Sequence, residues 1–308
     1  VNLSGWQSVN TIGEYFLNNC SALTELNINK WSSVTAIPNN FLNGCTSLTN
    51  LAINDWESIE TIGGDFLAGC TALKTLQLKN WTGVSEIPDN FLKGCESLED
   101  LDLSGWTGVT TINDYFLSGC EKLTNLNLSG WDGIETIYDY FLEGCESLES
   151  IDFTGFANLK TIGTGFLKGC IGLTDDGLDL SPLSNVTEIG DYFLTECTGL
   201  NNLDLTGLTS LETIGSNFLA GCTELVSLDI SNLTKLTAAP EYFCKDLTKL
   251  TTFKSEGLEG ITEIANYFLT GCTSLVDLDL TGWFNVQTIG SNFLDGCTAL
   301  ETLDMHGL

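Results

Sequence analysis

One phrase returns along the chain about every 25 residues, and this repeat constrains the fold more than any other feature. The stretch FLAGCTALKTLQLKNW at residues 66–81 reappears almost unchanged as FLKGCESLEDLDLSGW at residues 91–106. The aligned cysteines stand at positions 20, 45, 70, 95, 120, 145, 170, 197, 222, 272 and 297. Two residues are added between Cys170 and Cys197, and Leu247 marks a twelfth unit without the cysteine. A period this strict predicts a solenoid.

Within each unit the apolar residues alternate as L-x-L, as in Leu101 and Leu103. This alternation predicts a short strand with two side chains inward and the residue between them outward. A tryptophan follows in many units, and then V-x-x-I, as in Val109 and Ile112. The phrase F-L-x-G stands at the end of the unit. Within it, Phe116 and Cys120 are four residues apart, and this spacing predicts a helical or 3-10 turn that places both side chains in the core.

A single unit of this size cannot bury its own apolar face, so each unit must stack on the next. The expected fold is an α/β repeat solenoid: a right-handed coil with a parallel concave sheet and short helical turns on the convex side. No linker or composition break interrupts residues 1–308, which predicts one solenoid of about twelve units. Because the chain opens and stops within a repeat, we expect it to be part of a longer protein.

The charge of the chain is strongly negative. It carries 41 acidic residues against 11 basic ones, all of them lysine, for a net charge of −30. Such a chain repels the phosphates of nucleic acids and of anionic lipids, so neither is an expected partner. No apolar run approaches the ~20 residues needed to cross a bilayer, so we expect no membrane insertion in this segment.

The phrase L-x-x-L-x-L resembles a leucine-rich repeat. The fuller phrase F-L-x-G-C-x-x-L-x-x-L-D-L-S-G-W is similar to the cysteine-containing repeats of BspA-like bacterial surface proteins. The resemblance covers all twelve units and implies the leucine-rich-repeat fold and display outside the cell. The chain departs from ordinary leucine-rich repeats, which place asparagine where Trp106 stands to hold the backbone of the turn. We therefore expect neighbouring Ser and Asn side chains to form hydrogen bonds with the backbone groups of that turn.

The repeated cysteine allows three interpretations: a metal ligand, a disulfide or a buried thiol. Metal sites use close pairs, and the nearest cysteines here, Cys222 and Cys244, are 22 residues apart. Stacked parallel side chains ~4.8 Å apart suit a disulfide poorly. In one unit Leu247 takes the cysteine position while Cys244 takes a leucine position, which indicates an apolar environment. We predict buried thiols that bind no metal or cofactor.

The outward residue of each strand forms the candidate binding strip on the concave face, where such solenoids usually bind partners. Its members are Asn27, Gln77, Asp102, Asn127, Asp152, Asp179, Asp204, Asp229, Lys254, Asp279 and Asp304, with Ala52 between the first two. The strip is either a docking surface or a solvated acidic face that keeps the protein soluble. Enzyme chemistry is not expected, because the only histidine is His306 and there is no arginine.

Three further features each have a functional and a structural interpretation. Asp175, Asp176 and Asp179 could bind calcium or simply form an acidic turn. The tryptophans could stack on ligands, but leucine replaces them in later units, which favours packing. The aberrant unit at residues 238–260, with Ser255 at an inward strand position, marks either a site or drift in a tolerant repeat.

Taken together, the sequence predicts a non-enzymatic, adhesin-like protein at the cell surface. By the BspA resemblance, its concave face would bind an extracellular protein or glycan on host or neighbouring cells. The alternative is a structural stalk or filament segment that associates end to end.

Overall fold

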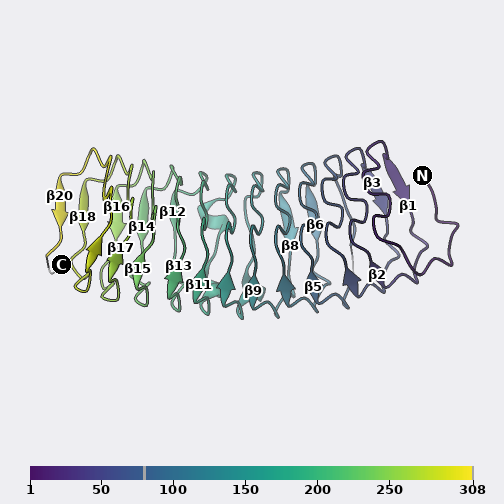
Figure 1. Cartoon of the computed structure of the whole chain (residues 1–308), viewed down its shortest axis with the longest axis horizontal. Helices are drawn as coiled ribbons and strands as arrows, with labels where there is room; N and C mark the ends of the chain where they lie inside the picture. Colours follow the sequence, from purple (N-terminus) through teal and green to yellow (C-terminus); the bar gives the residue numbers. More distant parts are fainter. Residues whose placement is uncertain (79–80, 307–308) are drawn as a thin grey trace. The chain divides into compact units, whose positions relative to one another are not determined.

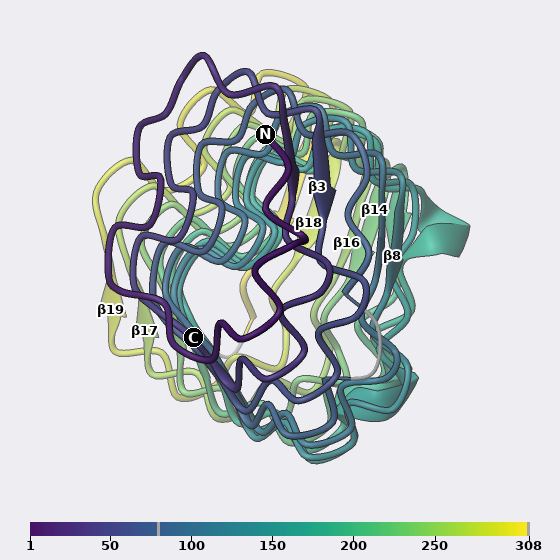
Figure 2. The same cartoon turned by 90° about the vertical axis from the view of Figure 1, so that its right-hand side faces the viewer.

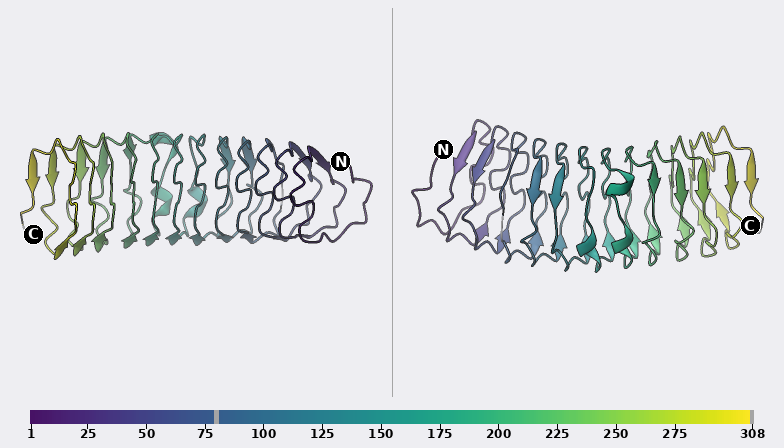
Figure 3. Two further views of the ribbon diagram at one scale, coloured as in Figure 1. Left: turned by 45° about the horizontal axis from the view of Figure 1, so that its top comes forward. Right: turned by 180° about the vertical axis from the view of Figure 1, so that it is seen from behind.

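The computed structural model describes residues 1–78 and 81–306. The chain forms two compact units, Val1–Asn158 and Leu159–Leu308. Within each unit the repeats are coils that stack side by side (Figure 1), and two further views show the same arrangement (Figure 3). That residues 1–308 form a single right-handed solenoid stays a prediction.

The L-x-L segments form the first set of strands. In the first unit these are β1 (Glu25–Asn27), β3 (Asn50–Ala52), β6 (Asp100–Asp102) and β8 (Asn125–Asn127). In the second unit they are β12 (Asn202–Leu203), β14 (Ser227–Asp229), β16 (Thr252–Lys254), β18 (Asp277–Asp279) and β20 (Thr302–Asp304). The pairing is parallel, and Leu101 lies opposite Leu126, one repeat away. The prediction of a parallel sheet is confirmed.

A second set of strands lies at the end of the V-x-x-I segment in eleven of the repeats, where the sequence indicated only core positions. The first unit contains β2 (Ala36–Ile37), β4 (Thr61–Ile62), β5 (Glu86–Ile87), β7 (Thr111–Ile112) and β9 (Thr136–Ile137). The second contains β10 (Thr161–Ile162), β11 (Glu188–Ile189), β13 (Thr213–Ile214), β15 (Ala238–Ala239), β17 (Glu263–Ile264) and β19 (Thr288–Ile289). These strands also pair in parallel. In the second unit, β14, β16 and β18 lie on one side of the coil and β17 and β19 on the other (Figure 2).

The expected helical turn at F-L-x-G is not confirmed; the described residues contain no α-helix. Tyr115, Leu117 and Gly119 have φ angles of 60°, 54° and 74°, in the left-handed region, and so interrupt any right-handed helix. The amides bond to other coils instead: Leu117 donates to Phe91 O at 3.0 Å, and Gly119 to Glu143 O at 2.7 Å. These bonds offset the roughly 1–2 kcal/mol that each left-handed non-glycine residue costs.

Helical structure occurs only as short 3-10 turns elsewhere in the described chain. They are η1 (Thr154–Phe156) in the first unit and η2 (Asp175–Gly177) and η3 (Ser181–Leu183) in the second. η2 holds the acidic residues of the longer repeat between Cys170 and Cys197, so the added length is accommodated there. The core positions of Phe116 and Cys120 were predicted correctly, because both are fully buried.

Aromatic files run through the core of each unit. Phe91, Phe116 and Phe141 stack with ring centroids 5.8 and 5.4 Å apart, and Phe193, Phe218 and Phe243 do so at 5.3 and 5.5 Å. Leucines and thiols fill the remaining space. Equivalent side chains of successive coils lie next to each other, so a residue type that recurs at one repeat position forms a continuous stack. Each coil thereby buries the apolar face of its neighbour.

Candidate functional site

The residues of the predicted strip lie on the surface of each unit. Along a strand the exposed and buried residues alternate, so Asp100 and Asp102 face outward while Leu101 is buried. Strand pairing brings predicted strip residues side by side: Asp102 lies opposite Asn127 in the first unit, and Asp279 opposite Asp304 in the second. Most members of the strip are exposed; Asn27 and Asp229 are half-buried.

A second outward column was missed at the sequence level. The residue before the inward-facing leucine or isoleucine also faces outward, and in three successive coils of the first unit it is Asp100, Asn125 and Ser150. The Asn125 amide donates to the Asp100 carboxylate. The period of two could have revealed this column, because the residues on both sides of an inward leucine must point outward.

The two columns border a surface hollow in the first unit with a volume of about 340 Å³. Its lining consists of Leu76, Gln77, Asp100, Leu101, Asp102, Thr124, Asn125, Leu126, Asn127, Ser150 and Asp152. Three carboxylates, three amides and two hydroxyls therefore surround a floor of leucine. No lysine is among the lining residues, so the hollow offers mainly hydrogen-bond acceptors and negative charge.

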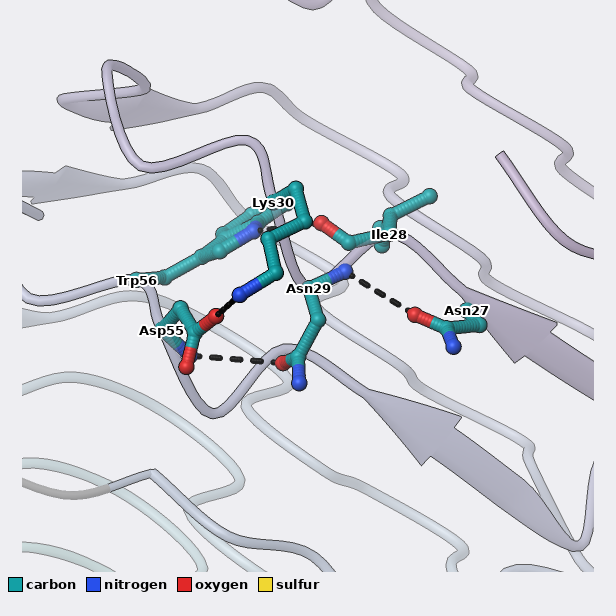
Figure 4. A network of polar contacts seen from close by, with 6 residues as sticks. All are labelled: Asn27, Ile28, Asn29, Lys30, Asp55 and Trp56. Carbon is teal, nitrogen blue, oxygen red and sulfur yellow. Dashed lines mark hydrogen bonds and ion pairs between the residues drawn. The ribbon is translucent and has the colours of Figure 1, made fainter. Parts of the chain in front are cut away.

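The strip residues also hold the turn that follows each strand. Asp102 Oδ1 accepts a hydrogen bond from the Ser104 backbone N–H at 3.1 Å, and Asp204 Oδ1 accepts from Thr206 at 2.8 Å. Asn27 does the same for Asn29 at 3.2 Å (Figure 4). Asp and Asn recur in this position because both carry an acceptor oxygen that can cap an amide two residues ahead.

This local bond affects the charge of the strip as well. Hydrogen bonds from the Ser181 backbone N–H and hydroxyl lower the pKa of Asp179 from its ordinary value. For Asp229, burial acts to raise the pKa, but hydrogen bonds from Ser231 and the nearby ammonium of Lys254 lower it overall. These carboxylates therefore stay ionised at neutral pH. A lowered pKa in the folded state contributes stability that is lost as the pH falls through that pKa.

Replacing Asp204 with alanine should lower the free energy of unfolding by roughly 0.5–2 kcal/mol, the usual range for a lost backbone cap. Asp204→Asn keeps the acceptor oxygen and should change stability less. Urea denaturation followed by tryptophan fluorescence measures both. Equal losses in the two variants would show that the bond to Thr206 contributes nothing.

The tryptophans are packing residues with an additional polar role. Trp31, Trp56, Trp81, Trp106, Trp131 and Trp283 are buried, whereas Trp6 is 62% exposed. Each buried indole N–H donates to a backbone carbonyl of the preceding coil, as Trp56 does to Ile28 O at 3.0 Å (Figure 4). The expectation that Ser and Asn hold this turn was incomplete, because the indole supplies a donor where ordinary leucine-rich repeats use asparagine.

Leu103 shows how this turn is satisfied. Its carbonyl accepts from the Trp106 backbone N–H at 3.0 Å and from the Trp131 indole at 3.1 Å. The second lone pair of the carbonyl is therefore used by the next coil. A tryptophan fits this role because it fills the core and donates one hydrogen bond.

Most of the thiols are buried, as predicted, and none of the twelve cysteines forms a disulfide. Ten are buried, while Cys20 and Cys297 are half-buried. Cys120 Sγ donates to Leu92 O and Cys145 Sγ to Leu117 O, each at 3.3 Å. The interpretation as apolar filler was therefore incomplete, because the thiol also donates a weak bond to the left-handed leucine of the preceding coil.

Burial suppresses the acidity of these thiols. It raises the pKa of Cys120 to about 12 and that of Cys222 to about 12. For Cys297 the direction is reversed: a hydrogen bond with Cys272 lowers its pKa. The thiolate is the reactive form, so the fully buried cysteines are unreactive in the folded protein.

The acidic residues of η2 have a structural role, because Asp175 forms hydrogen bonds to the next coil. Asp175 Oδ1 accepts from the backbone N–H groups of Asn201 and Asn202 at 2.8 and 3.1 Å, and Oδ2 accepts from the Asn202 side chain at 3.2 Å. The carboxylate therefore fastens this loop to the next coil. In the described part of the chain, no cluster of three His, Cys, Asp or Glu residues could hold a metal ion.

The aberrant repeat is explained by packing. Phe253 stands where other units have leucine, and it meets Phe243 and Phe268 edge-on with centroids 6.5 and 6.2 Å away. Ser255 is 2% exposed, its hydroxyl donates to Asp279 O at 3.2 Å, and its carbonyl accepts from the Trp283 indole. A larger phenylalanine beside a smaller serine preserves the core. Lys254 lies 3.8 Å from the Asp229 carboxylate and offsets its charge.

Comparisons with known proteins identify the same architecture. The sequence profile described as "BspA type Leucine rich repeat region" matches in six copies over residues 2–98, 35–174 and 177–301. A leucine-rich repeat protein from Bacteroides ovatus is 24% identical, with a TM-score of 0.63 over 96% of this chain and 76% of that one. A leucine rich cell surface protein from Faecalibacterium prausnitzii is 21% identical, with a TM-score of 0.57 over 97% and 84%. A search of curated proteins found no match.

The two paired sets of parallel strands and the stacked leucine core define a leucine-rich-repeat protein. The chain belongs to the BspA-type leucine-rich-repeat family. Proteins with this fold generally act as binding scaffolds, in which a regular surface carries the recognition residues. Among the described residues there is no helix of the length and hydrophobicity needed to cross a membrane.

Proposed function

We propose that this chain is a non-enzymatic binding module displayed at a bacterial cell surface. It recognises an extracellular protein or glycan through the outward residues of the first set of strands. The observation that carries the proposal is the hollow of about 340 Å³ over β6 and β8, where outward side chains from consecutive coils converge. The BspA-type family and the F. prausnitzii cell surface protein support display outside the cell.

Not every residue of the hollow is needed to hold the fold. Asp102 caps a turn, but Asp100 and Asn125 bond mainly to each other across β6 and β8. Their side chains therefore stay on the surface and can exchange this mutual bond for bonds to a ligand. A regular solenoid gains specificity from such positions because the backbone beneath them is rigid.

The test is binding to immobilised fibronectin, laminin and collagen and to a glycan array, with the double variant Asp100→Ala/Asn125→Ala. We expect saturable binding to at least one partner and at least a tenfold loss in the variant. Glu146→Ala, an exposed position of the same unit, is the matched control and should bind normally. Binding that is absent throughout, or equal in the double variant, contradicts the proposal.

The alternative of a stalk or filament segment predicts a different result. Light scattering at increasing protein concentration would then show steadily growing assemblies. A monomer at all concentrations, together with ligand binding at the hollow, supports the binding module.

A further inference from the structure

One exposed tyrosine stands where the repeat otherwise carries small or turn-forming residues. The residue directly after each second-set strand is Pro38, Gly63, Pro88, Asn113, Tyr138, Gly163, Gly190, Gly215, Pro240, Ala265 and Gly290. Ten of these eleven are either small or turn-forming and add little surface. Tyr138 is the single large side chain, so the repeat itself does not account for it.

Tyr138 contributes little to the core of its unit. It is 47% exposed. Its backbone N–H donates to Ile112 O at 3.1 Å, an arrangement that any residue except proline could make. Its hydroxyl has no hydrogen-bond partner among residues 1–78 and 81–306. An aromatic ring with this degree of exposure can stack against a flat apolar face of a ligand.

The ring borders a separate surface hollow of about 330 Å³ in the first unit. The hollow is lined by Thr110, Thr111, Gly133, Glu135, Thr136 and Tyr138. Thr111 and Thr136 lie opposite each other in β7 and β9. A Cβ atom at Gly133 would come within 3.1 Å of Thr110 Cγ2, so the glycine leaves space beside these threonines. The hollow thus combines one aromatic face, three hydroxyls and one carboxylate.

We propose that this hollow is a binding site for a neutral carbohydrate, with Tyr138 as the stacking platform. The C–H groups on one face of a sugar ring carry partial positive charge, which packs against the negative face of an aromatic ring. Sugar hydroxyls both donate and accept hydrogen bonds, which matches the threonine hydroxyls and the Glu135 carboxylate. The open hydroxyl of Tyr138 adds a further donor at the rim.

Other ligand classes fit less well. Polyanions are repelled by Glu135 and by the net charge of −30. An extended peptide usually gains affinity by adding a strand to a free edge. That mode is closed at β7, which already pairs with β5 on one side and β9 on the other. A ligand here must bind through side chains, as a neutral sugar does.

This site is distinct from the hollow over β6 and β8, because the two share no lining residue. The two inferences can therefore fail separately. Loss of binding at Tyr138 leaves the proposed function of the first hollow intact, and the reverse also holds.

The experiment uses the full chain and a panel of neutral hexasaccharides: maltohexaose, cellohexaose, laminarihexaose and mannohexaose. Isothermal titration calorimetry should detect at least one of them. Tyr138→Asn places in this unit the residue that the preceding repeat carries as Asn113, so the fold is retained. We expect this variant to bind at least tenfold more weakly, while Tyr138→Phe, which keeps the ring, stays within about threefold of the original protein.

Tyr15→Asn is the matched control, because Tyr15 is a comparably exposed tyrosine outside this hollow. It should bind as the unchanged protein does. Circular dichroism confirms that every variant is folded. The proposal is overturned if no hexasaccharide of the panel binds, or if Tyr138→Asn binds as well as the unchanged protein.

Discussion

Raising the pH from 8 to 11 should unfold this protein in one cooperative transition. Burial raises the pKa of Cys45 to about 11 and those of Cys120 and Cys222 to about 12, against an ordinary value of 9.0. A group whose pKa is raised in the folded state stabilises the fold fully below its unfolded pKa. That contribution is lost as the pH rises from about 9 towards the folded pKa.

The expected effect is large because the thiols act together. Each buried thiol lowers the free energy of unfolding by up to ~1.4 kcal/mol per pH unit in this window. Eight thiols have a pKa that is raised in the folded state, which gives a slope on the order of 10 kcal/mol per pH unit. A typical domain has a free energy of unfolding of only ~5–15 kcal/mol. The rise in pH should therefore remove the whole of this stability.

Tryptophan fluorescence and thiolate absorbance, recorded together under reducing conditions, measure this transition. Both signals should change at the same pH, because the thiols ionise only when the core opens. The variant Cys120→Ala/Cys222→Ala removes two titrating groups and should make the pH dependence of stability shallower. Thiolate absorbance that rises gradually while fluorescence stays constant would contradict the interpretation.

Replacing Trp106 with alanine should lower the free energy of unfolding by roughly 3–5 kcal/mol. Trp106 is fully buried, stacks on Trp81 with ring centroids 5.0 Å apart and meets Phe91 edge-on at 5.8 Å. Its indole N–H also donates to Leu78 O at 2.7 Å. The substitution therefore leaves both a cavity and a backbone carbonyl that loses its indole donor.

Two matched variants separate these contributions. Trp106→Phe keeps an aromatic ring but removes the donor, so it should cost less than the alanine variant. Trp6→Ala alters the same repeat position where the indole is 62% exposed, and it should change stability by less than about 1 kcal/mol. Chemical denaturation measures all three; a loss in Trp6→Ala equal to that in Trp106→Ala would show that burial does not set the effect.

Periodicity alone predicted much of the fold. The 25-residue repeat and the L-x-L alternation gave the stacked coils and the parallel register, because a repeated apolar pattern has few ways to be buried. The turn at residues 115–119 was predicted incorrectly. Four-residue spacing of Phe116 and Cys120 is compatible with a helix, but the left-handed φ angles of Tyr115 and Leu117 depend on hydrogen bonds to neighbouring coils. A local pattern cannot reveal bonds to residues some 25 positions away.

The candidate site was predicted in part. The column that includes Asp102 was identified, whereas the column with Asp100 and Asn125 was missed although the same alternation implies it. The role of Asp102 in holding its own turn depends on the backbone geometry after the strand. The hollow beside Tyr138 could not be predicted, because it depends on how Gly133 and the paired threonines are placed in three dimensions.

The indole and thiol bonds all run in one direction along the chain. Trp131 donates to Leu103, and Cys145 to Leu117, in each case a residue 28 positions earlier. These side chains therefore donate only to the preceding coil, whereas backbone amides such as that of Gly119 also donate to the following coil. As a ribosome releases the amino end first, a newly formed coil waits for the next to complete its hydrogen bonding. The indole and thiol bonds to a given coil can thus form only after the following coil has been synthesised.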